Sequence, residues 1–64
     1  MNVLILEDKK NSRDALRKII SSCTGVTCIY AFSGRGDALQ CAMDNHIDLF
    51  LLDIILEPEK RNDN

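Results

Sequence analysis

The chain has 64 residues, of which 45% are hydrophobic and 28% charged, and its formal net charge is -2. This composition is typical of one small folded domain and argues against a wholly disordered chain. The sequence has no basic tract, so nothing suggests that this segment binds nucleic acid. No apolar run is long enough to span a bilayer, so we expect no membrane segment and a cytoplasmic protein.

The cysteines indicate a reduced chain. They are odd in number and lack the C-x-x-C spacing of a zinc site, and an odd set fits no disulfide framework. We therefore expect them to be mostly buried, small apolar residues, consistent with a cytosolic chain. They are Cys23, Cys28 and Cys41.

The first predicted element is a strand from Asn2 to Leu6, an apolar run that ends in Glu7 and Asp8. A helix follows to about Ser22. Asn11 or Ser12 is expected to cap it, since a short side-chain oxygen can accept an unpaired backbone N–H. Apolar residues at three- and four-residue steps predict its buried stripe: Ala15, Leu16, Ile19, Ile20 and Cys23. Gly25 is expected to supply the left-handed conformation after the helix.

A second strand is predicted from Val26 to about Phe32, where β-branched and aromatic residues dominate. Its partly polar second face favours an edge position. A second helix is expected from Ser33-Gly34 to about Asn45. Its predicted inner stripe consists of Ala38, Leu39, Ala42 and Met43, flanked by Cys41.

The third predicted strand, Leu49 to Leu52, is an unbroken apolar run of the kind buried on both faces of a parallel sheet. It leads into Asp53. His46, at the corner before it, is expected to be an exposed turn residue. Residues 54–56 are apolar, whereas residues 57–64 contain no apolar residue except Pro58, so we expect a disordered tail there.

Strands alternating with helices predict an α/β fold of the doubly wound type, with a parallel sheet and right-handed crossovers. Two crossovers that wind in opposite senses place the first strand between the second and the third, in the order 2-1-3. In such sheets ligands bind beyond the carboxyl ends of the strands, at the topological switch point. Glu7, Asp8 and Asp53 are expected to meet there.

Three carboxylates at one edge of a sheet repel one another unless a cation lies between them. A hard divalent ion such as magnesium takes carboxylate oxygens, water and phosphate oxygens as ligands. An aspartate beside such an ion can also act as a nucleophile and accept a phosphoryl group. Taken alone, each of these acids could instead be a turn residue or a helix cap rather than a metal ligand. The two acidic stretches together are less easily explained in that way.

Three stretches of the chain are typical of a known family: Val3-Leu4-Ile5-Leu6-Glu7-Asp8, Phe32-Ser33-Gly34 with Asp37-Ala38-Leu39, and Leu49-Phe50-Leu51-Leu52-Asp53-Ile54. With these stretches the chain resembles the receiver domain of two-component response regulators. The resemblance implies a flavodoxin-like fold, Asp53 as the phosphoacceptor and a sensor histidine kinase as the phosphodonor. It also implies a magnesium ion held by Glu7, Asp8, Asp53 and the backbone carbonyl of Ile55.

The resemblance covers residues 1 to about 58, which correspond to the first half of the family's domain. We therefore expect a truncated receiver over residues 1–56, and the start of the loop after the third strand over residues 57–64. The family's switch Ser/Thr and its phosphate-contacting lysine have no counterparts in this chain. The implied role is phosphorelay signalling rather than enzyme catalysis.

Two other functions stay open. The chain could be an interaction fragment that associates through the third strand and performs no phosphotransfer. A small metal-dependent phosphatase is less favoured, because the position two residues after Asp53 is Ile55 rather than a second acid. The third strand would be an edge without charge, proline or glycine to block pairing, so we expect a homo-oligomer, most simply a two-fold dimer.

Overall fold

Three parallel strands form the centre of the molecule. The structure is a computed structural model that describes residues 1–53. Its elements are β1 (Asn2–Leu6), α1 (Lys10–Ser21), β2 (Cys28–Phe32), α2 (Arg35–Asp44) and β3 (Leu49–Leu52). The sheet order is β2-β1-β3, and β1 pairs in parallel with both neighbours. The predicted β-α-β-α-β fold and the 2-1-3 order are confirmed.

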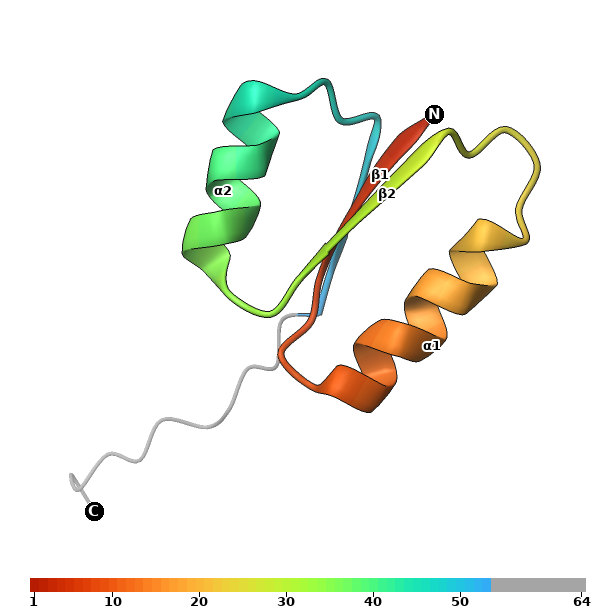
Figure 1. Ribbon diagram of the computed structural model, residues 1–64, viewed down its shortest axis with the longest axis horizontal. Helices are drawn as coiled ribbons and strands as arrows, with labels where there is room; N and C mark the ends of the chain where they lie inside the picture. The colour runs from red at the N-terminus through yellow and green to blue at the C-terminus, as the bar shows by residue number, and fades with distance from the viewer. Residues whose placement is uncertain (54–64) are drawn as a thin grey trace, which may run out of the picture.

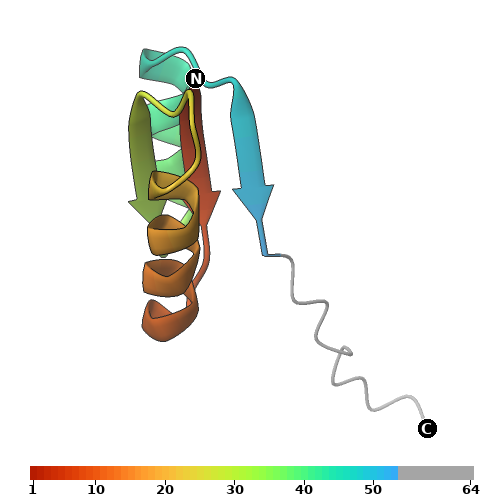
Figure 2. The ribbon, with the colours of Figure 1, turned by 90° about the vertical axis from the view of Figure 1, so that its right-hand side faces the viewer.

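The helices lie on opposite faces of the sheet, which Figure 1 shows almost edge-on. Both pack against β1 and β2, and within residues 1–53 neither helix contacts β3. Figure 2 shows the consequence: β3 stands beside β1 with no helix over it. Among the described residues, no helix has the length and apolar character needed to cross a membrane.

The core is centred on β1. Val3, Leu4 and Ile5 are at most 1% exposed, because a helix covers each face of the strand and another strand flanks each side. On the α2 face, Leu4 packs with Ala38 and Cys41. Partly buried apolar side chains surround this cluster: Leu6, Tyr30, Phe32, Ala42 and Ile47.

The burial of β3 differs from the sequence prediction, although its bounds are as predicted. Leu49, Phe50 and Leu52 are 38%, 48% and 51% exposed. The apolar composition predicts a strand covered on both faces, whereas residues 1–53 supply no covering element. β3 is therefore the least buried strand of the sheet.

The predicted stripes of the two helices are partly wrong. On α1, Ile19 is 59% exposed and Cys23 lies exposed beyond the helix. On α2, Leu39 and Met43 are exposed, and Cys41 takes their place against the sheet beside Ala38. The buried residues of α2 are therefore the small Ala38 and Cys41, which pack with Leu4 of β1.

The cysteine prediction is also wrong for two positions, since Cys23 and Cys28 are exposed and only Cys41 is buried. All three are free thiols. Cys28 begins β2, two residues later than the predicted start at Val26. A residue at the end of a strand has few neighbours, so its side chain stays exposed even when the residue is apolar. Gly25 has the predicted positive φ, at 90°, but it does not end the first helix, since α1 ends at Ser21 and its C-cap residue is Ser22.

Two hydrogen bonds of Asp48 connect the start of β3 to the start of β1. Its Oδ2 accepts the Asn2 backbone N–H at 2.7 Å, and its own N–H donates to the Asn2 carbonyl at 2.8 Å. Its Oδ1 lies 2.8 Å from Nε2 of His46, whose side chain is 81% exposed, as expected of a turn residue. The Asn2 N–H, and then His46, lower the pKa of Asp48 below its ordinary value of 3.8.

We expect Asp48→Asn to lower the urea midpoint of unfolding at pH 7 and to lower it less at pH 3, which is below the ordinary pKa of 3.8. A carboxyl whose pKa is lowered by folding stabilises the folded state above its unfolded pKa. That contribution is lost as the pH falls through the lowered value. Urea titrations of both proteins at pH 7 and pH 3, followed by circular dichroism, measure the difference. The control is Asp44→Asn, which removes the same charge from the end of α2.

A candidate metal centre

Glu7 extends β1 beyond its last paired residue and is held on several sides. Its N–H donates to the carbonyl of Phe32 at 3.0 Å, and its carbonyl accepts Nη1 of Arg13 at 3.0 Å. Its side chain is buried, at 3% exposure, and Oε2 accepts the Lys9 N–H at 3.1 Å. The position of this carboxylate is therefore fixed by the backbone around it.

The predicted caps of α1, Asn11 and Ser12, are wrong. The helix begins at Lys10, one residue before Asn11, and Lys9 occupies the capping position without a side-chain hydrogen bond. Glu7 instead accepts a backbone N–H at the positive end of the helix, where a carboxylate is favoured. The sequence signal was present, since an acid closely precedes the helix, but it competes with Asn11 and Ser12.

Asp53 is positioned by the same sheet. Leu52 is in register with Leu6, and the Asp53 N–H donates to the Leu6 carbonyl at 3.0 Å. Asp53 therefore follows β3 at the level where Glu7 follows β1. Its side chain is exposed.

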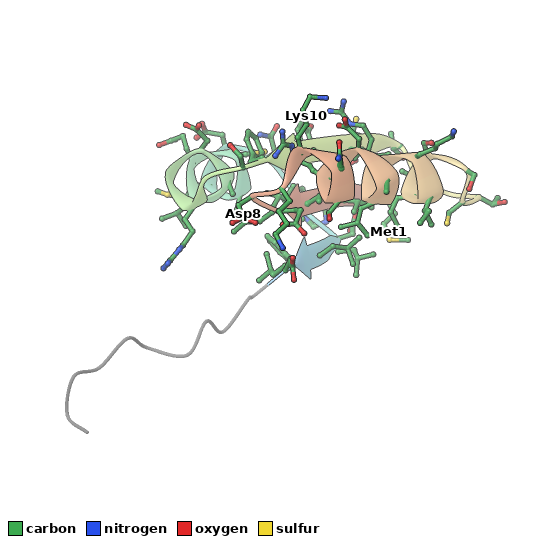
Figure 3. All side chains as sticks on the ribbon, turned by 90° about the horizontal axis from the view of Figure 1, so that it is seen from below. Met1, Asp8 and Lys10 are labelled. Atoms are coloured by element: carbon green, nitrogen blue, oxygen red, sulfur yellow. The ribbon has the colours of Figure 1, made fainter. Side chains whose placement is uncertain are left out.

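Asp8 is the third acid, on the connection between β1 and α1. Figure 3 looks at the molecule from the side on which the strands end, with Asp8 labelled there and Met1 labelled at the start of β1. The side chain is exposed, and no hydrogen bond to it occurs within residues 1–53. Unlike Glu7, Asp8 has both carboxylate oxygens available to a ligand.

The three carboxylates converge. One oxygen from each of Glu7, Asp8 and Asp53 can be chosen so that all three lie within 4.8 Å of one another. In the described part of the chain, the ion pairs are Lys10–Asp14 and His46–Asp48, so no lysine, arginine or histidine forms an ion pair with a carboxylate of this cluster. Lys10, labelled in Figure 3, points away from Asp8. The cluster is a concentration of negative charge with an exposed side.

No family model, curated protein or solved structure matches this chain.

The donor set suits a hard divalent cation. It consists of carboxylate oxygens, without the thiolate or imidazole ligands that zinc favours. Oxygens on opposite sides of a magnesium ion lie about 4.2 Å apart, and those around calcium about 4.6–5.2 Å apart. The 4.8 Å limit therefore admits either ion, with water filling the remaining positions. Ile55, the fourth ligand implied by the family resemblance, lies outside the described residues.

The structure thus brings together the three acids that the sequence placed at the switch point. Their convergence follows from the order β2-β1-β3, which makes β1 and β3 neighbours. The burial of Glu7 and the contributions of Lys9 and Arg13 were not predicted from the sequence. The backbone N–H of Lys9 donates to the Glu7 carboxylate, and the Arg13 side chain donates to the Glu7 backbone carbonyl.

Proposed function

We propose that this chain is a phosphoryl-accepting signalling module similar to the receiver domain of response regulators, with Asp53 as the acceptor. The observation that carries the proposal is the meeting of Glu7, Asp8 and Asp53 at the carboxyl ends of adjacent parallel strands. The absence of an ion pair to these acids within residues 1–53 supports a cation there.

In this proposal the acidic residues have different roles in binding the metal ion. Asp8 and Asp53 offer exposed oxygens to magnesium, and buried Glu7 fixes the inner side of the site. By the family resemblance, the Ile55 carbonyl completes the protein ligands. A bound magnesium ion would reduce the charge repulsion between the carboxylates and an incoming phosphate.

The transfer itself would use one oxygen of Asp53 as the nucleophile. That oxygen forms a bond to phosphorus, while the bond from phosphorus to the donor breaks and the donor keeps the electron pair. The product is an acyl phosphate on Asp53. The phosphodonor implied by the resemblance is the phosphohistidine of a sensor kinase. A small acyl phosphate can replace it in the test.

We expect slow and incomplete phosphorylation by acetyl phosphate with magnesium. No lysine or arginine of the described chain pairs with the cluster, so the cation alone would offset the charge of the phosphoryl group. Intact-mass measurement over time should show one added phosphoryl group, sensitive to hydroxylamine and dependent on magnesium. Asp53→Asn should abolish it, whereas Asp44→Asn should not. Failure of the wild type to gain mass, or an adduct that persists in Asp53→Asn, would contradict the proposal.

A second candidate function is that of an interaction module without phosphotransfer. It is favoured by the exposure of β3, on which neither helix packs. Such a module would show no mass increase with acetyl phosphate but would still associate through that strand. The two functions can also coexist, because the acids lie beyond the end of the strand rather than within it.

A further inference from the structure

The outer edge of β3 is a surface that the proposed phosphoacceptor site does not use. Within residues 1–53, β3 pairs only with β1, and neither helix covers it. Residues 49–52 contain no charge, proline or glycine, the features by which natural edge strands avoid pairing. Backbone groups at such an edge are best satisfied by another strand.

The hydrogen bonding of β3 shows which of its groups face outward. The Asp53 N–H donates to the Leu6 carbonyl on β1. In a parallel pair, alternate residues direct their backbone groups toward the same neighbour, so Leu49 and Leu51 also face β1. Phe50 and Leu52 therefore direct their N–H and C=O groups to the free edge.

The side chains of these residues divide between two faces of the sheet. Phe50 is in register with Leu4, and Leu52 with Leu6, so both share the face covered by α2 elsewhere in the sheet. They are 48% and 51% exposed. Leu49 and Leu51 lie on the opposite face. Phe50 and Leu52 thus have backbone groups that face the free edge and apolar side chains that are about half exposed.

We propose that β3 pairs in an antiparallel manner with β3 of a second copy of this chain, around a two-fold axis at Leu51. In this register Phe50 faces Leu52 of the partner subunit, and Leu52 faces the partner's Phe50. The outward backbone groups of both residues are then satisfied in hydrogen-bonded pairs. The two sheets become one continuous sheet across the axis.

Charge and geometry favour a second copy as the occupant. The edge carries no charge that would select an acidic or a basic partner, and its own sequence supplies the apolar residues that match it. Shifting the axis to Phe50 would place Leu52 opposite the partner's Asp48, whose N–H is already donated to the Asn2 carbonyl of its own chain, so the pair would lose a hydrogen bond. A register that pairs Leu49 with the partner's Leu52, and Phe50 with the partner's Leu51, would place residues whose backbone groups face outward opposite residues whose groups face β1. The hydrogen bonds between the two strands would then be lost.

The interface is small. A strand of four residues supplies only part of the ~800 Å² that each partner contributes to a standard stable interface. We therefore expect a reversible dimer whose population rises with concentration. A covalent trap is the appropriate test, because it captures an arrangement that separates during chromatography.

The test uses single cysteines in a chain carrying Cys23→Ser and Cys28→Ser, since both thiols are exposed. Leu51→Cys should form a disulfide dimer under mild oxidation, because residues facing each other in a non-hydrogen-bonded pair have Cα atoms about 4.5 Å apart, within disulfide range. Leu49→Cys lies on the same face and edge but meets its own copy only at a distance beyond ~7 Å, so it should stay monomeric. Circular dichroism of each reduced protein checks the fold.

The same trap can overturn the proposal. A disulfide in Phe50→Cys but not in Leu51→Cys would place the axis elsewhere. Equal crosslinking of Leu49→Cys and Leu51→Cys would indicate random collision, and no crosslinking of Leu51→Cys would exclude the pairing.

A charge exchange gives a second readout. Leu51→Lys and Leu51→Glu each place like charges opposite one another at the axis, so each alone should sediment as a monomer. A mixture of equal amounts should sediment as a dimer if the partner is a second copy of this chain. Sedimentation of the mixture as a monomer, while the wild type forms a dimer, would contradict the two-fold register.

Discussion

Replacing Asp8 by alanine should weaken magnesium binding by on the order of tenfold or more, a loss of ~1.4 kcal/mol for each factor of ten. Asp8 is exposed, and both of its carboxylate oxygens are available for a metal ion. Glu7 is buried and already accepts the Lys9 N–H, so it is better placed to bind through water. Glu7→Gln, which keeps an acceptor oxygen, should therefore cause a smaller loss. Isothermal titration calorimetry of the three proteins measures the order.

The matched control is Asp44→Ala, which removes one carboxylate from the end of α2, away from the carboxyl ends of the strands. It should leave magnesium affinity unchanged. Calcium titrated in the same way tests the choice of ion, because the spacing of the oxygens admits both. Equal affinity in the wild type and Asp8→Ala would remove the basis for a cation at this cluster.

The elements that sequence alone predicted best are the strands β1 and β3. Each is an unbroken apolar run with an acid directly after it, and their bounds match the prediction. The helices were placed correctly in order but began and ended one or two residues away from the expected positions. Helix ends depend on how the first N–H groups are satisfied. For α1 no side chain caps them, and Glu7 accepts only the N–H of Lys9, the residue before the helix.

The burial of individual side chains was harder to predict. Regular spacing shows which residues share a helix face, but not how much sheet lies beneath that face. Leu39 and Met43 are exposed because α2 packs on β1 and β2 through Ala38 and Cys41. Likewise the composition of β3 indicates an interior strand, and only the arrangement shows that both faces lack a covering helix within residues 1–53.

The candidate metal centre was predictable because it depends on topology rather than on detailed packing. Once β1 and β3 are parallel neighbours, the residues after each strand must meet at one edge. The roles within the cluster were not predictable in the same way. The burial of Glu7 and the exposure of Asp8 follow from how the connection to α1 turns. They determine which acid is open to a metal ion.

The largest effect on stability is expected from Leu4→Ala. Leu4 is 1% exposed and packs with Ala38 and Cys41 between β1 and α2. Such a change in a core typically costs about 2–5 kcal/mol, since it removes apolar contacts and leaves a cavity. Small domains are stable by only about 0.05–0.15 kcal/mol per residue. We expect Leu4→Ala to be largely unfolded, or to unfold at a much lower urea concentration.

The matched control is Leu39→Ala, the same chemical change at a residue that is 63% exposed on α2. Its cost should stay within about 0.5 kcal/mol, as for most surface substitutions. Urea titrations followed by circular dichroism measure both variants. Similar midpoints for the two would mean that β1 is not the centre of the core. Because Glu7 continues directly from β1, unfolding in Leu4→Ala should also abolish magnesium binding, whereas Leu39→Ala should retain it.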